Sequence, residues 1–132
     1  MDKAERYVTY HMANRSIKAG DAVMFDIDDT IWYPGTDTTN PNMINLIRKL
    51  GMMGYKIVII TARPRFEENV KWTRDQLYKF GIIPDVLEFI EAEKKSLCKQ
   101  YYTQSKCYNF ILSVGDMWTD LGYSKWWLKL PD

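Results

Sequence analysis

An apolar run that ends directly in three carboxylates constrains this chain more than any other stretch. Residues 22–25 read Ala-Val-Met-Phe, without helical periodicity, which is typical of a strand buried on both faces. Residues 26–30 then read Asp-Ile-Asp-Asp-Thr. Carboxylates at the end of a buried strand repel one another and lose hydration, and a hard cation such as Mg²⁺ would relieve both costs. The stretch therefore predicts an open α/β sheet with a ligand site at its carboxyl edge, although a hydrated acidic turn is the simpler alternative.

The size and composition of the chain limit the classes of protein to which it can belong. Its 132 residues predict a single domain over residues 1–132, with room for a hydrophobic core. A hydrophobic fraction of 46% argues against disorder, and a net charge of +1 indicates no strong field for polyanions, although local basic patches are compatible with it. The sequence has no apolar run as long as a membrane span, no signal-peptide pattern and two cysteines without metal-ligand spacing. We therefore expect a cytoplasmic protein without membrane association.

Helical and strand-like patterns alternate along the chain, which predicts an α/β fold. Amphipathic segments with caps predict helices, and short apolar or β-branched runs between turn residues predict strands. The expected helices begin at residues 3, 41, 66 and 91. The first, third and fourth end at residues 18, 80 and 102, and Gly51 or Gly54 ends the second, whose last apolar position is residue 50. The expected strands cover 22–27, 55–60, 86–90, 108–114 and 126–130. Because a strand, a helix and a strand form a right-handed crossover, the first two strands should be parallel.

A hydroxyl and a guanidinium group follow the second expected strand, which ends in Thr61-Ala62-Arg63. A threonine hydroxyl and neighbouring backbone N–H groups can donate to phosphoryl oxygens, and an arginine fork matches the same oxygens. A threonine that merely ends a strand, beside a hydrated arginine, is the alternative. We expect these groups at the same edge of the sheet as Asp26.

Two more carboxylates follow the fourth expected strand. This strand ends in Gly115-Asp116, and Asp120 comes four residues after Asp116. Gly115 permits a tight turn or a close backbone approach. If the turn begins a helix, Asp116 and Asp120 lie on one face and could share a cation.

Taken in order, these motifs resemble those of the haloacid dehalogenase superfamily, in its phosphatase branch. Residues 26–30 are similar to its first motif, DxDx(T/V), Thr61 to its second, and residues 115–120 to its fourth, GDxxxD. The resemblance covers about residues 20–130. It implies a three-layer α/β/α sandwich, a Rossmann-like fold with a mainly parallel five-stranded sheet in the order 5-4-1-2-3. Residues 31–39 leave room only for a minimal flap in place of a cap domain.

The third motif of the family is a lysine near the start of the helix before the last catalytic strand. Lys94 and Lys95 both match it by position. In a regular helix, Lys94 shares a face with residues 97, 98 and 101, which we expect to face the sheet. Lys95 would lie about 100° further round, nearer to solvent. We therefore favour Lys94 as the motif lysine and keep Lys95 as the alternative.

The resemblance implies a metal centre and two catalytic carboxylates. Mg²⁺ would be held by Asp26, by the backbone carbonyl of Asp28, and by Asp116 and Asp120. Asp26 would be the nucleophile that forms an aspartyl-phosphate. Asp28 would be the general acid and base, and its presence favours a phosphatase.

The remaining site residues would contact the transferred phosphoryl group. By resemblance, Thr61 and Lys94 would stabilise its oxygens, and so both count among the catalytic residues. Thr30, Ala62 and Arg63 complete the expected substrate contacts, with Thr30 also orienting the segment around Asp28.

The sequence thus predicts a Mg²⁺-dependent phosphoric monoester hydrolase. Its substrate could be a small phosphate ester, a nucleic-acid 3′-phosphate or a phosphoprotein, and nucleic acid is expected as substrate only. An oligomer in which a second subunit covers the site is compatible with the small size. The alternatives are a non-catalytic phosphate- or metal-binding interaction module and a phosphotransferase that uses the same intermediate. The presence of both Asp26 and Asp28 argues against the non-catalytic module.

Overall fold

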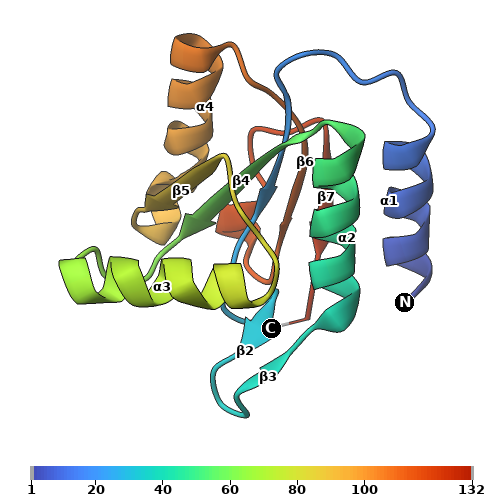
Figure 1. Cartoon of the computed structure of the whole chain (residues 1–132). Coiled ribbons are helices and arrows are strands. Elements are labelled where there is room, and N and C mark those ends of the chain that lie inside the picture. Colours follow the sequence, from blue (N-terminus) through green and yellow to red (C-terminus); the bar gives the residue numbers. More distant parts are fainter. Residues whose placement is uncertain (1, 132) are drawn as a thin grey trace.

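A five-stranded parallel sheet runs through the centre of the computed structural model, which describes residues 2–131 (Figure 1). Its strands are β1 (Asp21–Phe25), β4 (Lys56–Thr61), β5 (Val86–Phe89), β6 (Asn109–Gly115) and β7 (Trp126–Lys129). They lie in the order β5-β4-β1-β6-β7, and each pair of neighbours is parallel. If the five strands are numbered one to five along the chain, their order read from β7 is 5-4-1-2-3, as the sequence analysis expects.

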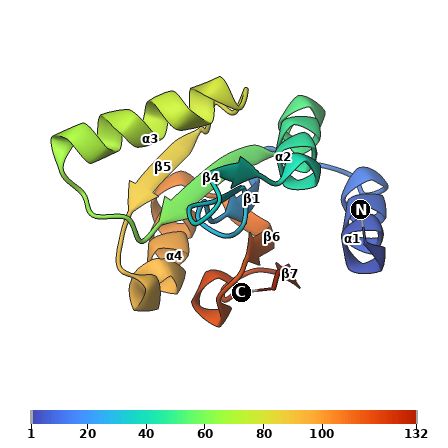
Figure 2. The same ribbon diagram turned by 90° about the horizontal axis from the view of Figure 1, so that it is seen from below.

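Helices cover both faces of the sheet. They are α1 (Lys3–Ala13), α2 (Pro41–Met53), α3 (Glu67–Lys79) and α4 (Lys95–Lys106). Figure 2 shows α1, α2 and α3 on one face and α4 on the other, which confirms the three-layer α/β/α sandwich. Within residues 2–131, none of these helices has the length and apolar character needed to cross a membrane.

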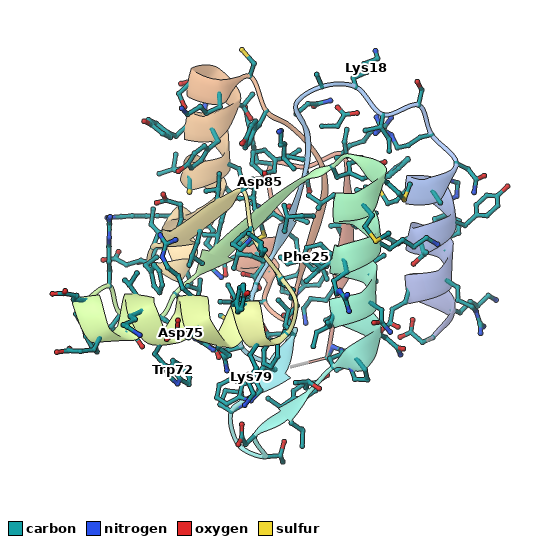
Figure 3. All side chains as sticks on the ribbon, viewed as in Figure 1. Lys18, Phe25, Trp72, Asp75, Lys79 and Asp85 are labelled. Atoms are coloured by element: carbon teal, nitrogen blue, oxygen red, sulfur yellow. The ribbon has the colours of Figure 1, made fainter. Side chains whose placement is uncertain are left out.

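The central strand β1 is buried along its whole length, as its uninterrupted apolar sequence predicts. Its side chains alternate between the two faces of the sheet. Val23 and Phe25 join the larger hydrophobic cluster, to which α1 and α2 contribute (Phe25 in Figure 3). Ala22 and Met24 join the smaller cluster, with Cys98 of α4. Two apolar layers therefore fix β1, and with it the position at which Asp26 leaves the sheet.

Helix α2 begins and ends as its sequence predicts. The Asn40 side chain accepts a hydrogen bond from the Met43 N–H at 3.3 Å, and Pro41 occupies the first turn. Gly54 ends the helix in the left-handed conformation, with φ of 111°. This helix carries the chain from β1 to the parallel strand β4.

The boundaries of α1 and α4 differ most from the sequence prediction, and α4 extends to Lys106 instead of residue 102. Helix α1 ends at Ala13 rather than at residue 18, where Asn14 leaves the helical conformation and its side chain caps the Tyr10 carbonyl. The following segment is held by Asp21, which pairs with Arg15 at 2.9 Å. Helix α4 begins at Lys95, after a 3₁₀ turn over Ala92–Lys94, instead of at residue 91.

The place of a cap domain is taken by a small hairpin. Its antiparallel strands are β2 (Trp32–Tyr33) and β3 (Thr38–Thr39). Trp72 projects from α3 toward this hairpin (Figure 3) and meets the ring of Trp32 with a centroid separation of 5.8 Å. The hairpin agrees with the minimal flap that the sequence predicts.

Candidate active site

Three buried carboxylates converge at the carboxyl edge of the sheet. Asp26 follows β1, and Asp116 follows the neighbouring strand β6. Asp120 reaches the same point from a 3₁₀ turn over Trp118–Asp120. One oxygen of each carboxylate lies within 4.8 Å of the others, and all three residues are buried. The strand ends therefore bring together carboxylates that are up to 94 positions apart in the sequence, between Asp26 and Asp120.

Lys95, and not Lys94, supplies the ammonium group of this cluster. The Lys95 Nζ donates to Asp26 Oδ1 at 3.1 Å and to Asp120 Oδ1 at 2.6 Å. The Lys94 side chain is 55% exposed and lies 3.5 Å from Glu91. The expectation that Lys94 faces the sheet is therefore wrong, and the alternative residue lies at the site.

The start of α4 explains this difference. The residues of α4 that face the sheet side are Lys95, Cys98 and Lys99, all of them buried. Leu97 and Tyr101, which the sequence places on the inner face together with Lys94, are each 62% exposed. Because the 3₁₀ turn precedes the helix, the buried face is shifted by one residue from the face that a regular helix from residue 91 would present.

Burial shapes the charge state of the cluster. Desolvation raises the pKa of Asp26 to about 7, and the nearby Asp120 adds to this rise, while Lys95 works against it. Desolvation likewise raises the pKa of Asp116. Burial alone would lower the pKa of Lys95, but Asp26 and Asp120 more than offset this effect and raise it. Lys95 therefore keeps its positive charge, and this single charge does not balance the negative charge of the ionised carboxylates.

The donor set fits a divalent metal ion. When all three carboxyl groups are ionised, they and one ammonium group leave an excess of two negative charges in a buried space. Carboxylate oxygens from separate chain segments are the ligands that Mg²⁺ prefers, and Mg²⁺ would balance that excess. Asp26, Asp116 and Asp120 are the residues that could hold it. The Asp28 side chain is not part of this group, which leaves its backbone carbonyl as the expected fourth protein ligand.

Without a metal ion, the Asp26 carboxylate is expected to weaken the fold as the pH rises. Since its pKa in the folded chain is about 7 and in an unfolded chain about 4, the folded chain binds more protons between these values. The contribution of Asp26 to the free energy of unfolding therefore falls across this interval. Urea denaturation in chelator at pH 5 and pH 7, for the native chain and Asp26→Asn, isolates the effect. The native chain should lose more stability than the variant, and an equal loss would contradict this.

Gly115 is required by the close approach of Asp120. A Cβ atom on residue 115 would overlap the Asp120 carboxylate. The same carboxylate accepts a hydrogen bond from the Met117 N–H at 3.1 Å, so it cannot move without losing a partner. The glycine of the fourth motif thus makes room for a candidate metal ligand.

We expect Gly115→Ala to displace Asp120 and to weaken Mg²⁺ binding at least about tenfold. Overpacking of this kind also costs about 1–3 kcal/mol of folding free energy. Gly35→Ala is the matched control, since a Cβ on Gly35 would meet no atom within 4 Å. Calorimetric titration with Mg²⁺ and thermal unfolding of both variants test this expectation. Equal Mg²⁺ affinity in the two variants would show that the close approach does not matter.

Asp28 and Arg63 form a pair beside the carboxylate cluster. Arg63 donates to both Asp28 oxygens, from Nε at 3.0 Å and from Nη2 at 2.8 Å. Its third contact is with Thr73 at 3.0 Å, and its guanidinium carbon lies 5.5 Å from the Trp32 ring centroid and 4.8 Å from that of Trp72. The arginine expected to bind substrate is thus fixed in place and directed at the expected general acid. No sequence pattern indicated Thr73 and Trp72 as its partners.

The remaining predicted residues lie around this edge in different ways. Thr61 ends β4 with its side chain buried, and its hydroxyl accepts from the Arg63 N–H at 3.2 Å. Ala62 is exposed beside it. Thr30 is fully buried, and within residues 2–131 its hydroxyl oxygen has no hydrogen-bond partner. The expected contact of Thr30 with substrate stays a prediction, as does that of Thr61, which is also buried.

Lys99 is a buried lysine that the sequence analysis did not single out. Its Nζ donates to Ser113 Oγ at 2.9 Å and to the carbonyls of Asp120 and Gly122, both at 2.6 Å. It thereby ties α4 to β6 and to the turn that carries Asp120. The i, i+4 spacing from Lys95 was the available signal, because residues four apart share a helix face.

Comparisons with known proteins support the fold. No protein-family model matches the chain, and no curated protein matches it. The chain does match solved structures. One is a class C acid phosphatase from Bacillus anthracis, with a TM-score of 0.61 and 17% sequence identity; the match covers 91% of this chain and 64% of the phosphatase chain. A chain of a Pnkp1/Rnl/Hen1 complex has a TM-score of 0.59 at 19% identity, with 91% of this chain and 49% of that one covered. This chain therefore has a fold similar to that of the class C acid phosphatase, and it spans less than two thirds of either neighbour.

Proposed function

We propose that this protein is a Mg²⁺-dependent phosphatase that hydrolyses a phosphomonoester through an aspartyl-phosphate at Asp26. The observation that carries this proposal is the convergence of Asp26, Asp116 and Asp120 around Lys95 at the carboxyl edge of the sheet. The acid phosphatase neighbour supports the same class of reaction by its fold.

Asp26 is the nucleophile of the proposed reaction. Bound Mg²⁺, held by Asp26, Asp116 and Asp120, would screen the repulsion between carboxylate and phosphate. An oxygen of Asp26 bonds to phosphorus while the bond from phosphorus to the leaving oxygen breaks. The Lys95 ammonium, 3.1 Å from Asp26, stabilises the charge on the nucleophile and on the phosphoryl oxygens.

Asp28 moves the proton in both half-reactions. In the first it protonates the leaving oxygen, and in the second it takes a proton from the water that attacks phosphorus. The bond between Asp26 and phosphorus then breaks, which releases inorganic phosphate and restores the carboxylate. Both Asp28 oxygens accept from Arg63, which orients the carboxyl group, and each oxygen keeps a further lone pair with which to bind the transferred proton.

The phosphoryl oxygens have further donors at the end of β4. The Thr61 hydroxyl and the backbone N–H groups that follow it lie beside the end of β1, since β1 and β4 are neighbouring parallel strands. Arg63 is charged and adjacent, so it contacts the phosphoryl group once it leaves Asp28.

Hydrolysis of an aryl phosphate with Mg²⁺ and with chelator tests the proposal. We expect turnover with Mg²⁺ and its loss in chelator. Turnover that is unaffected by chelator would refute the metal-dependent mechanism. Competition of water with added alcohols for the phosphoryl group distinguishes a hydrolase from a phosphotransferase.

A further inference from the structure

A groove lies between α1 and the outer strand β7, at the edge of the sheet. Trp126 of β7 packs against His11 of α1, Figure 2 shows both elements on the same side of the molecule, and the groove between them has a volume of about 660 Å³. The apolar face of α1 is only partly covered, because Val8 and Met12 are buried whereas Tyr7 is 67% exposed. Within residues 2–131, β7 pairs with β6 alone.

The groove combines aromatic faces with positive charge. The His11 ring lies 4.2 Å from the Tyr7 ring and 5.6 Å from the Trp126 ring, centroid to centroid, so the three form a row of neighbouring rings only in the sense that His11 contacts both of the others. Lys3 and Lys125 also line the groove, and none of its described lining residues is a carboxylate. The groove therefore has a mainly apolar lining and carries positive charge.

The groove also reaches the vicinity of the carboxylate cluster. Lys129, at its far end, is opposite Gly115 in the parallel ladder, and the Leu130 N–H donates to the Gly115 carbonyl at 2.8 Å. Gly115 directly precedes Asp116, a candidate metal ligand. The Lys129 ammonium lies 5.6 Å from the ring centroid of Trp118, which is 67% exposed. Because side chains alternate along β7, Lys129 and Trp118 lie on the face of this strand opposite to Trp126, while the carboxyl end of β7 lies at the edge of the sheet that carries Asp116.

We propose that this groove binds single-stranded nucleic acid. Lysines can neutralise successive phosphates, and exposed rings can stack with bases whatever the sequence. An acidic peptide would use the lysines but would leave the row of rings without a stacking partner. The low net charge of the chain does not oppose this, since the positive charge is local to the groove. The inference deepens the proposed function. Its consequence rests on that function: a nucleic-acid strand in the groove would present a terminal phosphate to Asp26.

Fluorescence anisotropy with a labelled oligothymidylate without terminal phosphate tests the groove by itself. We expect salt-sensitive binding that Tyr7→Ala weakens about tenfold, as loss of one stacked base would. Lys125→Ala should lower the slope of log affinity against log salt by about 0.7. Both side chains are exposed, so the variants should fold. Tyr78→Ala and Lys79→Ala on α3 are the matched controls and should bind like the native chain.

Three results would overturn the proposal. The first is an affinity that does not depend on salt. The second is a loss of affinity in the α3 controls equal to that in the groove variants. The third is displacement of the oligothymidylate by polyglutamate at equal charge concentration. The last result would make the groove a site for acidic peptides. Because the probe carries no terminal phosphate, an inactive phosphatase site would leave the outcome unchanged, so the two proposals fail separately.

Discussion

Replacing Asp26 with asparagine is expected to lower the turnover of an aryl phosphate by at least about 1,000-fold. Loss of a covalent nucleophile removes the reaction path and not merely a binding contact, and losses of this order or greater are usual. The amide in Asp26→Asn would keep the shape of the side chain but could not form the acyl phosphate. Steady-state kinetics with saturating Mg²⁺ measures the effect.

The fold of this variant should be intact. Desolvation raises the pKa of Asp26, so the neutral amide removes a charge that the folded chain disfavours. The melting temperature in chelator should therefore be equal to or higher than that of the native chain. Asp75→Asn is the matched control, because Asp75 is an exposed carboxylate on α3 paired with Lys71. Full activity of Asp26→Asn would refute the proposed nucleophile.

The second large effect is expected at Lys95. Its ammonium touches two carboxylates of the cluster, and removing a buried donor that stabilises developing charge costs about 100- to 1,000-fold in turnover. Lys95→Met should show this loss, whereas Lys94→Met should stay within about twofold of the native chain. The two lysines are adjacent in sequence, which makes Lys94→Met a closely matched control.

Stability separates a catalytic effect of Lys95 from unfolding. Breaking a buried ion pair costs about 3–5 kcal/mol, since it leaves the partner charge uncompensated. The kinetic comparison is therefore made with Mg²⁺ at a temperature where circular dichroism shows both variants folded. If Lys94→Met were the inactive variant, the assignment from the structure would be wrong.

The sequence predicted the sheet and most of the site because these depend on local patterns. The run 22–25 followed by carboxylates specified a buried central strand, and Asn40 with Pro41 specified the start of α2. Alternation of strand and helix then fixed a parallel sheet whose carboxyl edge gathers Asp26 and Asp116. The order of the strands came from the resemblance, and not from residue patterns.

The differences arose where the geometry depends on the exact start of a helix or on contacts distant in sequence. A 3₁₀ turn before α4 shifts its buried face by one residue, which exchanges Lys94 for Lys95. The fixing of Arg63 by Asp28 and two tryptophans joins three separate segments, and no spacing rule indicates it.

The covalent intermediate tests the central claim most directly. The native chain is mixed with an aryl phosphate and Mg²⁺, quenched during turnover and reduced with borohydride, which converts an aspartyl-phosphate to homoserine. Peptide mass spectrometry then locates the modified residue. The account predicts homoserine at position 26, and none when Mg²⁺ is chelated. Turnover accompanied by a label at another residue, or by no label in a quench fast enough to capture the intermediate, would contradict it.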